Sequence, residues 1–430
     1  MSLALIVMLA FLAGTCALGA AIGPAMIASG LVYLIISGQD VGLAAETILN
    51  GFFNSFVLLA VPLFIFAANV MNAGTISERL LDFSLAMVGR FRGGLAHVNI
   101  LTSLIFSGMS GSAIADAAGV GKVLIDMMRA NNRYPPGFAA AITGASATIG
   151  PIIPPSIPMV LYAMVSDQSV GALFLGGVGP GLLMTAVLML AVWLISRRRN
   201  FPTEATIPWR RYPGIVGRAI PPLLMPGILL GGIYGGAFTP TEAAAVAAFY
   251  ALILAGLAYR AIGPRTFFAI LVDTVRSSAV IAMIIAGAFL FNYIIATEQI
   301  PNAIAAWLSG FSLSPVVFLL LVSLLFLVFG CFLDATTMLL VLVPIILPSM
   351  KAMGIDLVHF GVVVVVNMMI GLITPPYGVL LFVINSLTGI ELASIIREMW
   401  AFIAILLAAL LLMILVPDIV LWLPHTLGYS

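Results

Sequence analysis

Apolar residues run in stretches of about 20 along almost the whole chain, and short polar turns separate one stretch from the next. A stretch of this length matches the roughly 30 Å hydrocarbon core of a bilayer. The pattern therefore predicts an all-α polytopic membrane protein. The expected crossings cover residues 3–21, 24–36, 52–71, 137–165, 170–195, 220–235, 243–259, 267–296, 358–386 and 400–423.

Two further apolar stretches, residues 95–130 and 315–350, are interrupted near their middles by small polar residues. A continuous crossing at residues 95–130 would put Arg92 and Lys122 on opposite sides of the membrane. A re-entrant helical hairpin keeps both ends of a stretch on one side and places its polar tip at mid-membrane. We therefore expect two hairpins, each preceded by a surface helix that is too charged or too short to cross. The tips are expected at residues 107–112 and 330–337, and the surface helices at residues 77–92 and 301–310.

A proline pair interrupts each of two predicted crossings. Pro154–Pro155 lies within residues 137–165, and Pro375–Pro376 lies within residues 358–386. Proline removes a backbone donor and clashes with the preceding turn, so neither stretch can remain a continuous helix. Lipid cannot satisfy the freed backbone groups, so such breaks belong where they are buried in protein or line a cavity. Helices interrupted at corresponding places in two halves indicate the substrate and ion site of a secondary transporter.

Composition excludes several classes of function. The 430 residues are 63% hydrophobic and only 8% charged, against about 25% charged in ordinary soluble domains. This leaves no soluble domain, and a net charge of +1 gives no support for a nucleic-acid partner. The chain has no Gly-Lys-Ser/Thr nucleotide loop, so any transport is expected to use an ion gradient. Two cysteines and three scattered histidines show no metal-ligand spacing.

A basic stretch with several prolines, residues 201–218, is expected to be a cytoplasmic linker between two halves, residues 1–200 and 219–430. Each half is expected to make five crossings and one hairpin. Because five is an odd number, the second half must be inverted relative to the first. The predicted fold is therefore a pair of inverted repeats.

The distribution of lysine and arginine supports this topology, because these residues collect in cytoplasmic loops. With the linker inside, most other basic residues also fall inside, and only Lys351 falls clearly outside. Both termini are then expected on the periplasmic side. The residues expected inside are Arg79, Arg90, Arg92, Lys122, Arg129, Arg133, Arg260, Arg265 and Arg397.

Few polar residues lie near the tips and breaks, and they suit an oxygen-based cation site. Interrupted helices leave free N–H groups that attract anions and free carbonyls that attract cations. Asp116 and Asp334 are the acidic residues near the tips, and an ionisable residue within a membrane is a candidate for function. Each could instead only hold its loop by hydrogen bonding. The other candidates are Ser110, Ser112, Thr143, Ser146, Thr336, Thr337, Asn367 and Thr374.

Four motifs together resemble the large membrane subunit of tripartite ATP-independent periplasmic (TRAP) transporters. They are Ser-Gly-Ser-Ala-Ile-Ala-Asp at residues 110–116, Gly-Pro-Ile-Ile-Pro-Pro-Ser-Ile at 150–157, Phe-Thr-Pro-Thr-Glu-Ala at 238–243, and Ile-Gly-Leu-Ile-Thr-Pro-Pro-Tyr-Gly at 370–378. The resemblance spans nearly the whole chain. It departs modestly at Tyr377, where a smaller residue is expected.

The resemblance implies an elevator mechanism, in which a transport domain of hairpins and broken helices slides against a scaffold. It also implies Na⁺ as coupling ion, with no other cofactor, and import across the bacterial inner membrane. The implied partners are a small four-helix membrane subunit, a periplasmic substrate-binding protein, the lipid bilayer and an organic acid such as a C4-dicarboxylate or sialic acid.

Carried over by position, the resemblance assigns two sets of residues. Those expected at Na⁺ are Ser110, Ser112, Asp116, Ser146, Gly150, Thr337, Asn367, Gly371 and Thr374. Those expected at the substrate are Ser110, Ser112, Pro154, Pro155, Asp334, Thr336, Pro375 and Pro376.

Three other readings are compared with the tripartite one. A standalone ion-coupled carboxylate carrier would need no binding protein, and a passive channel would ignore a Na⁺ gradient. An intramembrane aspartyl protease would require Asp116 and Asp334 to share a proton. Neither lies in a Gly-x-Gly-Asp motif, so the chain is not expected to be an enzyme.

Overall fold

The computed structural model describes residues 2–73, 76–205, 207–311 and 313–429, and its regular elements there are all helical. Seven of the described helices are long and apolar enough to cross a membrane. The other apolar helices, of 10–17 residues, include α1, α2, arms of both hairpins and segments of the interrupted helices. The predicted all-α class is therefore confirmed.

The first half of the chain begins with a group of helices and ends with a hairpin, an interrupted helix and a long helix. The opening group is α1 (Leu3–Ala17), α2 (Ile22–Ser37), α3 (Gly42–Asn54), the short η1 (Phe56–Leu59), α4 (Ala60–Ala73) and α5 (Ile76–Val88). The hairpin is α6 (Gly94–Ser110) with α7 (Ala113–Asp116), η2 (Ala117–Gly121), α8 (Lys122–Arg129) and η3 (Ala130–Asn132). The interrupted helix is α9 (Pro136–Ala147) with α10 (Ile157–Ser166), and α11 is Val170–Arg199.

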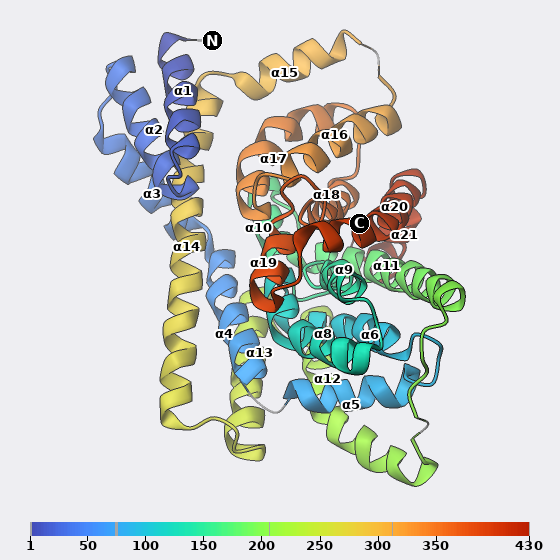
Figure 1. Cartoon of the computed structure of the whole chain (residues 1–430). Helices are drawn as coiled ribbons and strands as arrows, with labels where there is room; N and C mark the ends of the chain where they lie inside the picture. Colours follow the sequence, from blue (N-terminus) through green and yellow to red (C-terminus); the bar gives the residue numbers. More distant parts are fainter. Residues whose placement is uncertain (1, 74–75, 206, 312, 430) are drawn as a thin grey trace.

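The second half presents a similar order of elements. It opens with η4 (Trp209–Arg211), α12 (Tyr212–Tyr234), α13 (Pro240–Leu252), η5 (Ile253–Ala258), α14 (Pro264–Thr297) and α15 (Ile300–Ser309). The hairpin is α16 (Pro315–Gly330) with α17 (Ala335–Ala352). The interrupted helix is α18 (Leu357–Gly371) with α19 (Val379–Thr388), and α20 (Leu392–Leu415) and α21 (Asp418–Thr426) complete the chain. Figure 1 shows α5 and α15 at opposite ends of the molecule.

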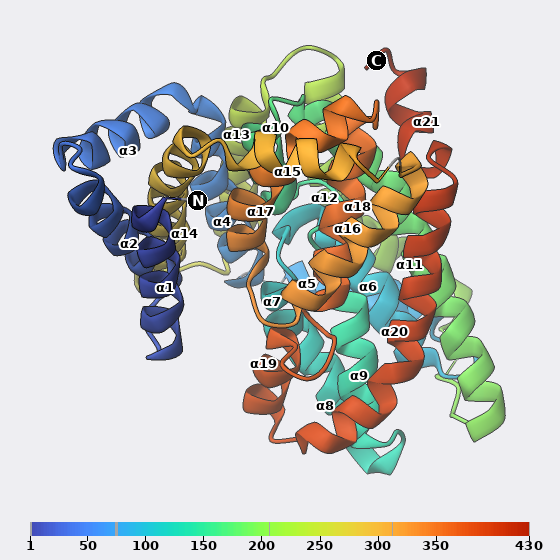
Figure 2. The ribbon, with the colours of Figure 1, turned by 90° about the horizontal axis from the view of Figure 1, so that it is seen from above.

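The interrupted helices form the centre of the protein. Every residue from Gly137 to Ala147 in α9 is buried, and so is every residue from His359 to Gly371 in α18. A helix that is buried on all sides packs against protein all round. Figure 2, seen from above, shows the remaining helices arranged around this region, with α1–α3 to one side and α11 and α20 to the other.

Helix α14 is the longest described helix, with 34 residues, and it packs closely against α2. A Cβ atom added to Gly23 of α2 would lie 2.8 Å from the backbone of Met283. One added to Gly287 of α14 would lie 2.8 Å from Met26. Small residues let two helix backbones approach closely, which is how helices associate in lipid. The glycines therefore fix α14 against α2.

A hydrogen bond joins α14 to the second hairpin. The Asn292 amide donates to the Leu340 carbonyl of α17 at 3.0 Å. This carbonyl lacks the usual helical partner four residues later, because that residue is Pro344, which has no N–H. Asn69 of α4 likewise donates to Thr274 of α14 at 3.0 Å.

The described helices differ from three of the predicted boundaries. Helix α12 begins at Tyr212, so the last seven residues of the predicted linker, 212–218, are helical. Pro213 permits this because it lies in the first turn, where its missing N–H is not needed.

The other two differences concern spans that were predicted as continuous. The expected crossing at residues 400–423 is two helices, because α20 starts at Leu392 and ends before Pro417, after which α21 begins. The expected start at Phe52 belongs to α3, and the chain turns at Ser55 before it enters α4. Hydropathy alone does not mark these turns, since apolar residues flank both.

We predict that Gly23→Leu destabilises the protein, because its side chain would meet the backbone of α14. Overpacking a well-packed contact costs about 1–3 kcal/mol, so the midpoint of thermal unfolding of the purified protein should fall by several degrees. Gly14→Leu is the matched control, since a Cβ atom at Gly14 of α1 has nothing within 4 Å. Equal midpoints for the two variants would contradict the close α2–α14 contact.

Candidate functional site

The tip of the first hairpin lies directly on the first break. Helix α6 ends at Ser110, Gly111 takes a left-handed conformation with a φ of 60°, and Ser112 caps α7 by accepting from the Ala115 N–H at 3.4 Å. A Cβ atom on Gly111 would lie 2.5 Å from the Pro155 carbonyl oxygen. The contact therefore requires glycine for both its conformation and its lack of a side chain.

Asp116 links the same tip to the start of the break. Its side chain is buried, and Oδ1 accepts a hydrogen bond from the Ser110 hydroxyl. The other oxygen, Oδ2, is buried without a described partner, and a Cβ atom on Gly150 would lie 2.6 Å from it. Immediately after Asp116 the helix widens into the π-helical turn η2, a distortion that is frequent at functional sites.

A buried polar network connects the hairpin to α9 below the tip. Asn99 of α6 donates to Thr143 at 2.6 Å, and Ser146 donates to the Asn99 side-chain oxygen at 2.9 Å. Ser103 of α6 donates to the Ser146 hydroxyl at 3.0 Å. Ser146, predicted as a Na⁺ ligand, is thus already hydrogen-bonded to α6. Sequence reasoning missed Asn99 and Ser103, although two polar residues four apart in an apolar helix are a visible signal.

The second hairpin meets the second break through glycine as well. A Cβ atom on Gly371 would lie 2.9 Å from backbone atoms of Gly330, so these two segments of the chain touch through their backbones. The Cys331 thiol lies 3.9 Å from the Pro375 carbonyl oxygen. At the tip, Asp334 caps α17 by accepting from the backbone N–H of Thr337 at 3.1 Å and from its hydroxyl at 2.5 Å.

Asn367 lies in α18 ahead of the second break, at the position that corresponds to Ser146 in α9 ahead of the first: each is four residues before a glycine, Gly371 or Gly150. Its amide nitrogen donates to the Ser323 carbonyl of α16 at 2.7 Å. Its side-chain oxygen is buried without a described partner. Thr374, by contrast, donates to the Ile370 carbonyl of its own chain segment at 2.7 Å.

The two tips enclose a cavity of about 240 Å³ together with both breaks. Four helices begin at this cavity, and each presents its first residue there: Ala113 of α7, Ile157 of α10, Ala335 of α17 and Val379 of α19. Helix N-termini carry unpaired N–H groups and a partial positive charge, so they attract anions. The other lining residues are Gly111, Ser112, Ile114, Pro151, Pro158, Ile281, Asp334, Thr336, Met369 and Leu372.

The cavity contains little charge of its own. No lysine, arginine or histidine occurs among its described lining residues, and Asp334 is the single acidic one. The described part of the chain also contains no group of three His, Cys, Asp or Glu residues that could hold a metal ion. An anion here would therefore be held by backbone and hydroxyl donors.

The structure distributes the predicted substrate residues unequally. Ser112, Asp334 and Thr336 line the cavity, whereas Ser110 lies behind the tip and bonds Asp116. The prolines Pro154, Pro155, Pro375 and Pro376 are not among the lining residues; each pair has a cis peptide bond between its members.

Most of the cavity wall is apolar and was missed by sequence reasoning. Ile281 is notable because it belongs to α14, outside the hairpins and interrupted helices. No sequence motif marks such a residue, because only the packing of α14 brings it to the site.

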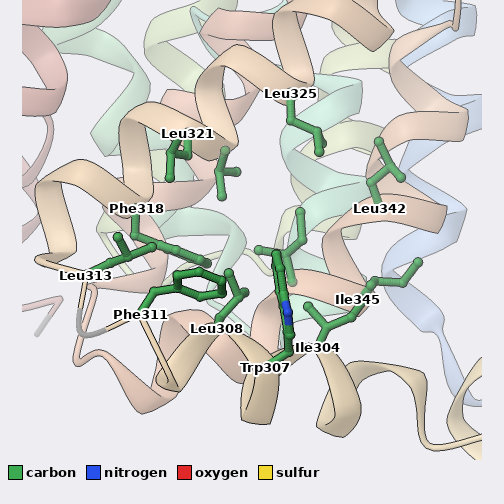
Figure 3. Close-up of a pocket in the computed structure, with 12 residues that line it drawn as sticks. Ile304, Trp307, Leu308, Phe311, Leu313, Phe318, Leu321, Leu325, Leu342 and Ile345 are labelled. Atoms are coloured by element: carbon green, nitrogen blue, oxygen red, sulfur yellow. The ribbon is translucent and has the colours of Figure 1, made fainter.

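A larger cavity, of about 460 Å³, does not fit a carboxylate. It lies between α15, α16 and α17, and Figure 3 shows the side chains that enclose it, among them Trp307, Phe311 and Phe318. All its described lining residues are apolar. The smaller cavity between the tips is therefore the better candidate for an organic anion.

Comparison with known families decides the identity of the chain. Residues 5–419 match the model of the family described as the DctM component of the tripartite ATP-independent periplasmic transporters. The chain belongs to this family.

Similar TRAP proteins cover nearly its whole length. The sialic acid TRAP transporter large permease SiaM of Vibrio cholerae is 41% identical over 414 residues, 96% of each chain. The C4-dicarboxylate large permease DctM of Pseudomonas aeruginosa is 41% identical over 87% of this chain and 88% of its own. The 2,3-diketo-L-gulonate large permease YiaN of Escherichia coli is 35% identical over 97% and 98%.

A solved structure agrees at the level of the fold. The YdaH transporter of Alcanivorax borkumensis, described as having an unusual topology, superposes with a TM-score of 0.62 over 86% of each chain, at 17% identity. The resemblance to the TRAP large subunit is thus confirmed. As a member of this family, the protein is a multi-pass membrane transporter component.

In this TRAP permease, Gly111→Ala should separate the first tip from its break. Alanine would meet the Pro155 carbonyl, which adds about 1–3 kcal/mol of overpacking to the roughly 1 kcal/mol of a left-handed alanine. Gly354→Ala is the matched control, because Gly354 has a φ of 66° but nothing within 4 Å of a Cβ atom. Thermal unfolding should show a larger loss for Gly111→Ala, and equal losses would exclude the tip contact.

Proposed function

We propose that the protein imports an organic acid across the bacterial inner membrane, driven by Na⁺, as the large subunit of a tripartite system. The observation that carries this proposal is the convergence of four helix N-termini on one cavity between the tips. Partial positive charges from backbone groups suit a carboxylate and need no basic side chain. The names of the related permeases refer to acids, including sialic acid and C4-dicarboxylates.

The two tips differ in a way that orients the substrate. Ser112 caps α7 with a neutral hydroxyl, while Asp334 caps α17 with a carboxylate. Asp334 already supplies negative charge to the N-terminus of α17, so a second anion is less stable there. We therefore place the substrate carboxylate beside Ser112 and the start of α10, and a hydroxyl, amide or amine of the substrate beside Asp334 and Thr336.

Two buried oxygens support Na⁺ as coupling ion. Oδ2 of Asp116 and the side-chain oxygen of Asn367 both lack a described donor, and one lies beside each break. A buried acceptor without a partner is costly, and hard cations prefer oxygen ligands from carboxylates, amides, hydroxyls and carbonyls. The residues present therefore fit Na⁺. We propose four further ligands near these two oxygens, in contact or in sequence: Ser110, Gly150, Gly371 and Thr337.

The arrangement of elements supports inverted repeats and an elevator. The hairpin of α6–α8 lies near α5, the hairpin of α16–α17 lies near α15, and Figure 1 shows these surface helices at opposite ends. We assign α1–α4 and α12–α14 to a scaffold. The hairpins and interrupted helices, with α11 and α20, form the transport domain that slides along it.

Membrane orientation and partners complete the proposal. We place the end with α5 in the cytoplasm, because α5 contains Arg79, Arg90 lies two residues beyond it, and Figure 1 shows the start of α12 at the same end. We also propose that both termini are periplasmic. The proposed partners are a small four-helix membrane subunit and a periplasmic substrate-binding protein, with no nucleic acid.

The direct test is uptake of labelled organic acids into liposomes that contain the chain with its small subunit. We expect accumulation only when an inward Na⁺ gradient and a binding protein are both present. Equal uptake by the chain alone would favour a standalone carrier. Uptake that ignores the Na⁺ gradient would contradict coupling.

We expect Asp116→Asn and Asp334→Asn to affect different ligands. Asp116→Asn should raise the Na⁺ concentration for half-maximal uptake about tenfold or more, because it removes the charge beside the unpartnered oxygen. Asp334→Asn should instead raise the half-saturating concentration of the acid. Asparagine still caps a helix well, so the fold of α17 is preserved.

Uptake kinetics with Na⁺ and acid varied separately distinguish the two effects. Identical changes in both variants would defeat the assignment of separate sites, and wild-type kinetics in both would remove both residues from the site. Like Asp334→Asn, Ser112→Ala should raise the half-saturating concentration of the acid, since both residues line the cavity.

A further inference from the structure

A third cavity, separate from the two described above, lies at the end of the molecule where α5 is found. It has a volume of about 360 Å³ and is enclosed by α5 and by the chain that leads into α12. The Tyr212 hydroxyl donates to the Ala86 carbonyl at 2.8 Å, so the two walls are joined. Figure 1 shows α5 and the start of α12 together at this end. Nothing in the proposed transport cycle uses this cavity.

The cavity combines apolar walls with one positive charge. Its described lining residues are Leu85, Ala86, Met87, Arg90, Ala205, Ile207, Trp209 and Tyr212. Arg90 is the single charged residue among them, and it forms no ion pair with any described carboxylate. Its guanidinium carbon lies 5.5 Å from the centre of the Phe91 ring. A ligand for this site needs both an apolar part and an anionic group.

Position favours a lipid over a water-soluble ligand. Helix α5 has charged residues on one face and apolar residues on the other, the pattern of a helix that lies at the level of lipid headgroups. Trp209 is 82% exposed although it lines the cavity, and its ring lies 5.0 Å from that of Tyr212. Exposed tryptophan and tyrosine rings are typical of the boundary between hydrocarbon and headgroups.

The charge balance favours an anionic lipid. A zwitterionic headgroup adds a positive ammonium charge beside Arg90, and no described carboxylate lines this cavity to balance it. The neighbouring cavity of about 260 Å³ is different, because Glu78 and Asp82 line it together with Arg79 and Arg218. Two charges of each sign give that cavity no preference for an anion.

We propose that the cavity between α5 and the start of α12 binds the headgroup of an anionic phospholipid. Arg90 contacts the phosphate, and the apolar side chains Leu85, Met87 and Ile207 cover the beginning of the acyl chains. Trp209 stands at the mouth. The lipid thereby bridges α5, which leads into the first hairpin, and α12.

Fluorescence of Trp209 tests the proposal in the full chain. Trp193, Trp307, Trp400 and Trp422 are replaced by Phe, and brominated phosphatidylglycerol or brominated phosphatidylcholine is titrated into the detergent-solubilised protein. We expect phosphatidylglycerol to quench Trp209 at a concentration about fivefold lower than phosphatidylcholine does. One arginine near a lipid surface favours an anion by about that factor. Arg90→Ala should remove the preference, and Arg90→Lys should keep most of it.

Arg265→Ala is the matched control. Arg265 is exposed at the start of α14, at the same end of the molecule but outside the cavity, so its loss should leave the preference unchanged. Equal quenching by the two lipids, or an unchanged preference in Arg90→Ala, would overturn the proposal. Displacement of the brominated lipid by glycerol 3-phosphate at an equal concentration would do so too, because the acyl chains would then add nothing to binding.

Discussion

Hydrocarbon cannot form hydrogen bonds, and this constraint explains the centre of the protein. Two buried chain segments leave the helical conformation, one after Ala147 and one after Gly371. Their backbone groups need partners that lipid does not supply. The hairpin tips contact the breaks, so each irregular segment is enclosed by protein. The cavity between the tips, with its four helix N-termini, follows from the same enclosure.

Close approach at these contacts depends on residues without side chains. Gly111 meets the Pro155 carbonyl, and Gly330 meets Gly371 backbone to backbone. Because the two tips are supported in the same way, the difference between their capping residues stands out. A serine at one tip and an aspartate at the other make two similar helix ends chemically unequal. Similar backbones thus present one end that attracts negative charge and one that is already neutralised.

Local chemistry made part of this predictable from sequence. Proline pairs mark the breaks because they act on the backbone at their own positions, and Ser112 and Asp334 stand out as polar residues in apolar surroundings. Boundaries that depend on packing were not predictable: α12 begins at Tyr212 within a basic stretch, and apolar residues hide the end of α20. The cavity wall was equally hidden, since Ile281 reaches it only through the placement of α14. Asn99 could have been noticed, but nothing in the sequence names its partners.

In the proposed elevator, the hydrogen bond from Asn292 to the Leu340 carbonyl joins the scaffold helix α14 to the hairpin helix α17 of the transport domain. Because Pro344 has no N–H for that carbonyl, the proposed sliding of the hairpin along α14 would leave the carbonyl without this donor. One hydrogen bond is worth about 1 kcal/mol, which would bias two positions of an empty carrier by roughly fivefold. If the hairpin slides as proposed, Pro344 and Asn292 give the empty protein a preferred position, although neither residue lines the cavity between the tips.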